Sequence, residues 1–414
     1  MCIDDDTNQT PEVVMLRNKR FFAAFTLMVM LVGALASCSE ALPEETLPST
    51  TAPTTTTTEA TTTTEATTTV EETDPPLVFS TAVVTERVVD LYGQLSVEGT
   101  NLVDSAGIPI QLKGMSTYGM NAIGDFLNED TVQTLAEDWG CSVIRLAMYT
   151  MGTPDGYIHD PDKYFTKMCE CIDLCVDQGV YVIVDWHILF DGDPTQYQAE
   201  AIDFFDRISA LYADCPNVIY EICNEPNGMR YDDETQPVDW DNCIRPYAEA
   251  LIDTIRANDE DNIIIVGTST WSQDVDIAAR NPLDGDNLMY TLHFYAGSHG
   301  QDHRDRVVEA IEAGLPIFCT EWGTTRDSGA GEVFYEESYA WLCLLEEYNI
   351  SWCNWSIGGS STEASNALKF VSNILTVQEK YEGHWPDEFI SRSGLFVRDM
   401  ILGRPFDINN YIEE

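Results

Sequence analysis

One stretch of the chain decides its fold: Val218-Ile219-Tyr220-Glu221-Ile222-Cys223-Asn224-Glu225-Pro226. Five of its first six residues are apolar or aromatic, and no polar face recurs at helical spacing, so the pattern predicts a short buried strand. The strand delivers Asn224 and Glu225 at its end, where Pro226 stops it. Barrels of parallel strands carry their chemistry at the C-terminal strand ends, which makes Glu225 a candidate catalytic carboxylate.

Strand and helix patterns alternate eight times around this stretch. The predicted strands are residues 110–114, 142–147, 180–185, 218–223, 263–267, 288–292, 316–320 and 351–354. Continuous apolar runs at 181–184 and 263–266 indicate parallel strands covered on both faces. We therefore expect an α/β fold, a (β/α)8 TIM barrel. An open doubly wound sheet is the alternative, but no glycine-rich phosphate turn follows the first strand. Two alternating runs around residues 104–107 predict an N-terminal hairpin that can plug the barrel.

The N-terminal part of the chain has a different composition. Residues 21–37 are almost wholly apolar and follow a basic segment, 17–20, as in a secretory signal peptide. They end on Leu35-Ala36-Ser37-Cys38, which resembles a bacterial lipobox and predicts lipidation of Cys38. Signal cleavage beside a chance cysteine is the alternative. Residues 1–14 are acidic and unlike a signal, so initiation at Met15 is a further hypothesis.

A Thr, Pro, Glu and Ala-rich segment follows, most clearly at residues 41–76. Such a composition cannot bury a core and predicts a disordered stalk. The expected organisation is therefore a signal and lipobox region at 1–38, a linker at 39–76 and a barrel domain at 77–414. We expect an exported protein, held at the cell surface through Cys38 or otherwise secreted.

The net charge and the spacing of the cysteines limit the classes of molecule that the protein is expected to bind. The chain has 70 acidic and 21 basic residues, a formal net charge of -49, and lacks the basic footprint that nucleic acid or an anionic surface requires. A neutral ligand such as a glycan fits better. The 12 cysteines show no paired short-loop spacing, so free thiols are expected rather than metal ligands. We expect a monomer with no metal or organic cofactor, contacting a membrane only through its lipid anchor.

Polar and aromatic residues gather at the predicted strand ends. They are Arg145, Tyr149, Asp185, His187, Asn224, Glu225, Trp271, His293, Tyr295, Glu321 and Trp355. As core residues without partners, the charged members would each cost several kcal/mol, so their convergence favours a functional site. Two carboxylates, Glu225 and Glu321, fit double-displacement glycoside hydrolysis, with carboxyl groups roughly 5 Å apart. We expect Trp186 and Trp322 to pack in the barrel wall, and His299 and His303 to lie on the solvated surface.

Six motifs in order resemble one known family. They are Val143-Ile-Arg-Leu-Ala-Met-Tyr-Thr150, Val184-Asp-Trp-His-Ile-Leu189, Val218-Ile-Tyr-Glu-Ile-Cys-Asn-Glu-Pro-Asn-Gly228, His293-Phe-Tyr-Ala-Gly-Ser-His-Gly300, Phe318-Cys-Thr-Glu-Trp-Gly323 and Asn354-Trp-Ser356. Together they closely resemble glycoside hydrolase family 5, the cellulase family, and its bacterial endoglucanases, over about residues 94–403.

The resemblance implies a retaining endo-β-1,4-glucanase that hydrolyses a β-glucan. It implies that Glu225 is the acid/base and that Glu321, ionised beside Arg145 and Tyr295, is the nucleophile; exchanged roles are the alternative. The implied substrate-binding residues are Arg145, His187, Asn224 on the sugar 2-hydroxyl, His293, Tyr295 and Trp355 beneath the reacting sugar. Tyr149 and Trp271 are further substrate-binding candidates from their places at strand ends, Trp271 as a platform on the leaving-group side with packing as the alternative.

The sequence departs from this family pattern in two places. Tyr118 and Ala122 stand where such endoglucanases usually have His and Trp. Residues 358–361, which include Ser360, stand where a Lys often follows the Asn-Trp-Ser motif. We therefore expect intact bond-breaking chemistry with weakened or altered binding on the non-reducing side of the reacting sugar. Mannan, xyloglucan or mixed-linkage glucan are alternative substrates. A non-hydrolytic cell-surface glycan-binding protein is the alternative from another class, but a pure binder has no need of both Glu225 and Glu321.

Overall fold

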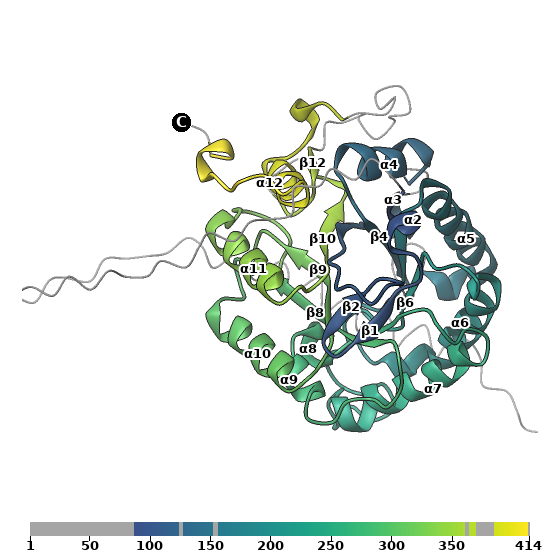
Figure 1. Ribbon diagram of the computed structural model, residues 1–414. Coiled ribbons are helices and arrows are strands. Elements are labelled where there is room, and N and C mark those ends of the chain that lie inside the picture. Colours follow the sequence, from purple (N-terminus) through teal and green to yellow (C-terminus); the bar gives the residue numbers. More distant parts are fainter. Residues whose placement is uncertain (1–86, 124–126, 152–155, 361–363, 370–384, 413–414) are drawn as a thin grey trace, which may run out of the picture. The chain divides into compact units, whose positions relative to one another are not determined.

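Eight parallel strands form a closed barrel in the computed structural model, which describes residues 87–123, 127–151, 156–360, 364–369 and 385–412 (Figure 1). The strands are β3 Lys113–Thr117, β4 Val143–Tyr149, β5 Tyr181–His187, β6 Val218–Glu221, β7 Ile264–Val266, β8 Leu288–Tyr295, β9 Ile317–Gly323 and β10 Trp352–Ile357. Their order around the ring follows the chain, and β10 closes it by pairing with both β9 and β3. The predicted (β/α)8 barrel is confirmed.

A helix follows each barrel strand and packs outside it (Figure 1). These helices are α4 Glu129–Gln133, α5 Pro161–Gln178, α6 Gln198–Tyr212, α7 Arg245–Arg256, α9 Val275–Ala278, α10 Gln301–Glu312, α11 Tyr335–Glu347 and α12 Arg392–Ile401. Shorter elements are α2 Val88–Tyr92, α3 Met120–Ile123, α8 Ser269–Ser272, β11 Gly359–Ser360, β12 Leu368–Lys369, and π turns Thr134–Asp138 and Trp240–Ile244 beside α4 and α7. In α5, Asp160 caps the Lys163 N–H, Pro161 begins the helix, and left-handed Gly179 ends it.

Side chains alternate between two cores along the regular parts of the strands, as the two-residue period of a strand requires. On β4, Val143 belongs to the cluster inside the barrel, whereas Ile144 and Leu146 belong to the cluster between strands and helices. Trp186 and Trp322 are fully buried in this outer cluster, which confirms that they pack in the wall. The lower barrel interior is apolar, so the polar side chains are concentrated at the C-terminal strand ends.

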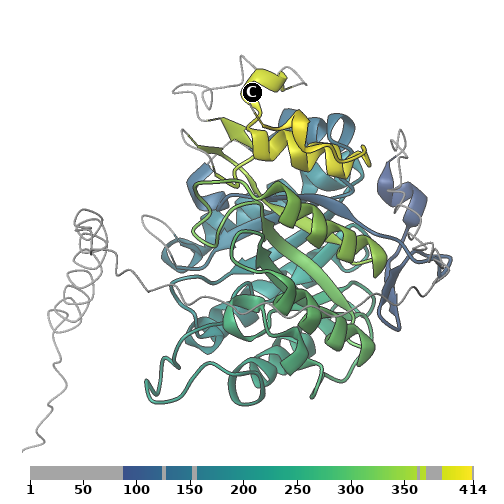
Figure 2. The same cartoon turned by 90° about the vertical axis from the view of Figure 1, so that its left-hand side faces the viewer.

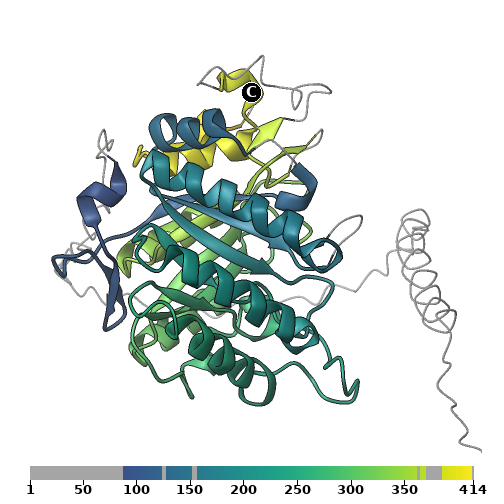
Figure 3. The ribbon, with the colours of Figure 1, turned by 90° about the vertical axis from the view of Figure 1, so that its right-hand side faces the viewer.

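The N-terminal hairpin closes the other end of the barrel (Figures 2 and 3). Its strands are β1 Ser96–Glu98 and β2 Asn101–Val103, and its Leu102 packs in the barrel's inner cluster. Tyr181 donates from its hydroxyl to the Gly93 carbonyl at 2.6 Å. The plug is as expected: the chain makes one tight turn at Gly99, between β1 and β2, and the expected hairpin turn around residues 104–107 follows it. Across this second turn Val103 forms an antiparallel bridge with Pro109, the Asp104 N–H donates to the Ile108 carbonyl at 3.0 Å, and the Ile110 N–H donates to the Leu102 carbonyl at 3.0 Å.

Several expectations concern residues that the structure does not describe. The signal segment 21–37, Cys38, the linker 39–76 and the domain boundary at 77 lie outside the described residues and stay predictions. Within the described part of the chain, no helix has both the length and the apolarity needed to cross a membrane. The ten cysteines described are all free thiols, in line with their expected role in packing.

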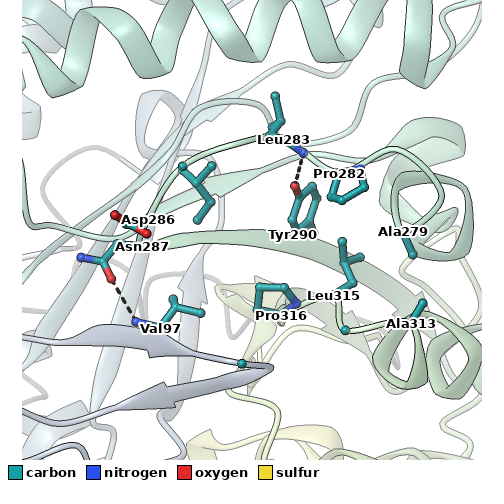
Figure 4. A pocket seen from close by; sticks show the side chains of 14 residues that line it. Val97, Ala279, Pro282, Leu283, Asp286, Asn287, Tyr290, Ala313, Leu315 and Pro316 are labelled. Atoms are coloured by element: carbon teal, nitrogen blue, oxygen red, sulfur yellow. Dashed lines mark hydrogen bonds between the residues drawn. The ribbon is translucent and has the colours of Figure 1, made fainter.

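A cavity of about 280 Å³ lies beside the hairpin at the N-terminal end of β8 (Figure 4). Its lining includes Val97, Leu283, Tyr290, Leu315 and Pro316 together with the polar residues Asp286 and Asn287. The Tyr290 hydroxyl accepts from the Leu283 N–H at 2.6 Å, and the Asn287 side chain accepts from the Val97 N–H at 3.0 Å. Because Glu225 and Glu321 lie at the opposite ends of the strands, this cavity is separate from the candidate site.

Candidate active site

An extra residue in β9 turns Glu321 into the barrel. Between two successive pairings, Thr291 with Phe318 and His293 with Glu321, β8 advances two residues and β9 advances three. The pairing of β9 with β10 shows the same difference. Such a bulge shifts the side-chain alternation, so Glu321 points inward and Trp322 packs outward. The nucleophile candidate therefore owes its direction to a local irregularity.

Arg145, on β4, is the centre of the site. It is fully buried, and its guanidinium lies 3.1 Å from Glu321 Oε2 and 2.9 Å from Asp185 Oδ2. It also donates to Asn224 Oδ1 at 2.7 Å. Burial opposes its charge, but the surrounding carboxylates hold the pKa of Arg145 well above its ordinary value. The contact with Glu321 that the family resemblance implied is therefore present.

Glu221 is a functional residue that the sequence reasoning missed. Its two carboxylate oxygens accept from Arg145 Nε at 2.7 Å and Nη2 at 3.1 Å, and Oε1 also accepts from Thr320 at 2.7 Å. The pattern of residues 218–223 predicts an apolar strand and gives Glu221 no role of its own. A glutamate in such a fully buried run requires a buried partner, and that requirement was the available signal.

The two candidate catalytic carboxyls have different surroundings. Glu321 is held by Arg145 and by the Tyr295 hydroxyl, which donates to its Oε1 at 2.8 Å. Glu225 faces His293 Nδ1 at 3.0 Å. Burial raises the pKa of Glu225 to about 8, with Arg145 opposing the rise. Burial and Glu225 also raise the pKa of Glu321, but its direct contact with Arg145 favours the anion there. Glu321 is thus the carboxyl that ionises first.

His187 and Asn224 form a fixed pair beside this centre. His187 Nδ1 lies 2.6 Å from Asp185 Oδ2, and His187 Nε2 lies 3.3 Å from Asn224 Nδ2. Since an amide nitrogen can only donate, Nε2 accepts and Nδ1 carries the hydrogen. Burial lowers the pKa of His187 to about 3 and raises the pKa of Asp185 to about 7. The imidazole is therefore neutral under ordinary conditions.

Aromatic rings from β10, from β4 and from the residue after β3 form one wall of the site. Trp355 stacks on His187 with centroids 5.2 Å apart, and Tyr149 packs edge-on against the same ring at 4.5 Å. Tyr118, 40% exposed, lies 5.9 Å from Trp355 between ring centroids. A Cβ at Gly119 would meet the Tyr149 ring at 1.9 Å, so this close packing requires glycine. The side chains of Ala122 and Ser360 lie outside the described residues.

Trp271 lies on the opposite side, after β7. It is 46% exposed, and Thr270, Trp271 and Ser272 all have left-handed backbones with φ of 57°, 55° and 56°. The segment is held in place because Trp271 donates its N–H to the Pro226 carbonyl at 3.1 Å and Ser272 donates to the Asn224 carbonyl at 2.6 Å. Strain of this kind in non-glycine residues is typical of functional sites. Trp271 is the sequence-predicted residue that remains most open to a ligand.

Glu225, His293 and Glu321 are also near enough to share a cation. One ligand atom from each lies within 4.8 Å of the other two. However, Arg145 and Tyr295 already bind the two oxygens of Glu321, and a guanidinium in this position repels a cation. The arrangement is therefore better suited to acid/base chemistry than to a resident metal.

The expectation for His299 was wrong. Its side chain is buried, its Nδ1 accepts from the Tyr295 N–H at 2.8 Å, and its carbonyl accepts from Trp341 Nε1 at 2.7 Å. A polar loop pattern does not reveal that the loop folds back over a strand end. His299 packs against His303 and supports the backbone of Tyr295.

A closed parallel barrel with paired carboxylates at its fourth and seventh strand ends is typical of (β/α)8-barrel glycosidases. Comparison with known proteins agrees. A family model described as cellulase, glycosyl hydrolase family 5, matches residues 103–361, which is more than half of the chain. The chain belongs to glycosyl hydrolase family 5, and the resemblance seen in its motifs is confirmed.

Individual relatives support this assignment. Endoglucanase A of Evansella cellulosilytica is 49% identical over 295 residues, 71% of this chain and 57% of the relative. An endoglucanase of Clostridium saccharobutylicum is 48% identical over 311 residues, 75% of this chain and 65% of the relative. The chain thus spans less than two thirds of either protein. The catalytic domain of Thermobifida fusca endoglucanase Cel5A, solved in complex with cellotetraose, has a TM-score of 0.68 and 34% identity, over 76% of this chain and 99% of that chain.

We predict that Glu221→Gln destabilises the barrel by about 3 kcal/mol, because it removes one partner of a buried ion pair. Urea unfolding of the full chain measures this loss. Glu170→Gln is the matched control: its carboxylate lies 3.8 Å from Lys167 Nζ and is 61% exposed, so the change should stay within about 0.5 kcal/mol. Equal effects of the two substitutions would contradict the role given to Glu221.

Proposed function

We propose that the protein is a retaining endo-β-1,4-glucanase that cleaves cellulose or a related β-1,4-glucan by double displacement. The observation that carries this proposal is the pairing of Glu225 and Glu321, whose nearest functional atoms lie within 4.8 Å. Retaining glycosidases place their carboxyl groups about 5 to 5.5 Å apart, whereas inverting enzymes leave a wider gap for water. The endoglucanase relatives support the same substrate class.

In the first step, a Glu321 carboxylate oxygen attacks the anomeric carbon as the glycosidic C–O bond breaks. Glu225 gives its proton to the departing sugar oxygen. Because burial holds the pKa of Glu225 at about 8, this group remains protonated at neutral pH, and kcat/KM should fall as the pH rises through about 8. Arg145 and Tyr295 keep the nucleophile ionised and oriented.

In the second step, the unprotonated Glu225 takes a proton from water while the water oxygen attacks the anomeric carbon. The ester bond to Glu321 breaks, and the sugar is released with its original β configuration. Asn224 has one weak contact, at 3.3 Å to His187 Nε2, which a sugar 2-hydroxyl can replace. Trp355 supplies an apolar face for the reacting sugar, beside His187.

Azide rescue tests the two roles. We expect Glu225→Ala and Glu321→Ala each to lower polysaccharide hydrolysis by about 1000-fold or more, because each removes a group that acts in the transition state. With azide and an aryl cellobioside that has an activated leaving group, Glu225→Ala should form a β-cellobiosyl azide. Glu321→Ala should form the α-azide, because azide then displaces the aglycone directly. Product configuration is read by proton NMR.

Glu234→Ala is the control for this experiment, since Glu234 is an exposed glutamate in the loop after Glu225. It should keep wild-type hydrolysis and form neither azide as a rescue product. An α-azide from Glu225→Ala together with a β-azide from Glu321→Ala would exchange the roles, and undiminished hydrolysis in either variant would remove that residue from the mechanism.

We further propose that the substrate is bound mainly on its leaving-group side. In the ring β6, which Glu225 follows, stands opposite β10, and β7, which Trp271 follows, stands opposite β3, so a glycan chain laid across the ring would extend from Trp355 and Tyr118 towards Trp271. The Tyr118 and Ala122 departures weaken the other side. Trp271→Ala should lower kcat/KM on cellohexaose about tenfold, because a stacking face contributes about 1 to 3 kcal/mol.

Leu211→Ala is the matched control for Trp271→Ala, because Leu211 is 62% exposed but lies on the outer helix α6. It should leave kcat/KM unchanged. Separate subsite affinities follow from the cleavage patterns of cello-oligosaccharides of increasing length. Strong non-reducing-side affinities, or equal behaviour of the two variants, would contradict the proposed asymmetry.

We also propose export and lipid anchoring at Cys38. The support is the basic segment 17–20, the apolar segment 21–37 and the residues Leu35-Ala36-Ser37 before Cys38. The Thr-rich linker would then hold a monomeric barrel away from the membrane. Cys38→Ala should move the enzyme from the membrane fraction to the medium and abolish incorporation of labelled fatty acid. Unchanged membrane association of the variant would contradict lipidation.

A further inference from the structure

One line of buried hydrogen bonds leads from Glu225 into the barrel wall. His293 Nδ1 lies 3.0 Å from Glu225 Oε1, and His293 Nε2 lies 2.9 Å from Thr320 Oγ1. Thr320 Oγ1 in turn lies 2.7 Å from Glu221 Oε1. All four side chains are buried, and Glu225, the most open, is only 8% exposed. In such surroundings the position of each proton has a large energetic effect.

The direction of each hydrogen bond follows from the chemistry of the partners. Both oxygens of Glu221 accept from Arg145, which favours a carboxylate that can only accept. A threonine hydroxyl has a single proton, so Thr320 donates it to Glu221. Its oxygen must then accept from its remaining partners, namely the Thr291 hydroxyl and His293 Nε2. His293 therefore carries its hydrogen on Nε2.

This tautomer leaves a lone pair on His293 Nδ1, facing Glu225. A protonated Glu225 can donate to that lone pair, whereas an ionised Glu225 would face it without a hydrogen between them. Burial lowers the pKa of His293 to about 4, so the ring is neutral and does not supply the proton itself. The other charged or titratable groups around Glu225 and His293 are Arg145, Tyr149, Asp185, His187, Glu221, Tyr295 and Glu321.

We propose that Thr320 is a positioning residue that fixes the Nε2–H tautomer of His293 and thereby keeps the proton on Glu225 until the leaving group takes it. The inference rests on the proposed function, because it assigns a use to a protonated Glu225. The same tautomer of His293 also affects the second step of the reaction. Once Glu225 has lost its proton, the facing lone pair destabilises the carboxylate and makes Glu225 a stronger base towards water.

The pH dependence of kcat/KM tests this role in the full chain. In Thr320→Val the hydroxyl is lost, so His293 can move its hydrogen to Nδ1 and donate to ionised Glu225. The basic limb should then move about one pH unit lower, the size expected for one hydrogen bond to a charged group. Thr320→Ser restores the hydroxyl, so the basic limb of its kcat/KM profile should return to the wild-type pH.

Thr324→Val is the matched control. Thr324 is equally buried, and its hydroxyl lies 2.7 Å from Ser393 Oγ, with no contact to His293 or Glu225. The variant loses a similar hydrogen bond and should keep the wild-type basic limb. A folded Thr320→Val with an unmoved basic limb would overturn the proposal, and so would a Thr324→Val that moves the limb equally.

Nitrogen NMR of protein labelled at histidine gives a readout that does not depend on turnover. In the wild-type protein and in Thr320→Ser, His293 should be protonated at Nε2 and not at Nδ1; in Thr320→Val the pattern should reverse. A wild-type His293 protonated at Nδ1 would overturn the proposal even if Thr320→Val does not fold. If this tautomer is found but no β-glucan is cleaved, the proposed function fails and the role of Thr320 in setting the tautomer stands.

Discussion

The buried guanidinium of Arg145 is the constraint on which the site depends. A charge inside a barrel is tolerated only when carboxylates and hydrogen-bond acceptors surround it. Those acceptors come from different strands: Asp185 from β5, Glu221 from β6 and Glu321 from β9. Neutralising one cation thus fixes the relative positions of three strand ends. The apolar interior below and the hairpin plug exclude water from one side, which strengthens these interactions.

The active site contains more carboxyl groups than positively charged groups. Asp185, Glu221, Glu225 and Glu321 all lie near the single guanidinium of Arg145, and four buried carboxylates cannot all be ionised around one positive charge. Glu221 and Glu321 contact Arg145 directly, whereas Glu225 instead faces a histidine. Burial and the excess of carboxyls therefore act together to keep a proton available on Glu225. An acid and a nucleophile arise from identical side chains because their distances to one cation differ.

Much of this arrangement could be predicted from the sequence, because period and position are local properties. Eight apolar runs indicated the barrel, and Glu225 could be placed because its strand stops at a proline. The contact partners of a side chain, by contrast, are not a local property of the sequence. Glu221 looked like one residue of an apolar run, and His299 like a surface residue, since the sequence does not show which side chains meet across the barrel.

The bulge in β9 could not be predicted from the sequence either. It gives both Thr320 and the nucleophile candidate Glu321 their inward directions. In a regular strand, neighbouring side chains point to opposite faces, so Thr320 and Glu321 could not both reach the barrel interior. The extra residue allows Thr320 to contact Glu221 and His293 while Glu321 contacts Arg145 and Tyr295. Removing the bulge would restore regular alternation and turn one of the two outward. The group that ionises as nucleophile and the hydroxyl that orients the acid's partner therefore depend on the same backbone irregularity.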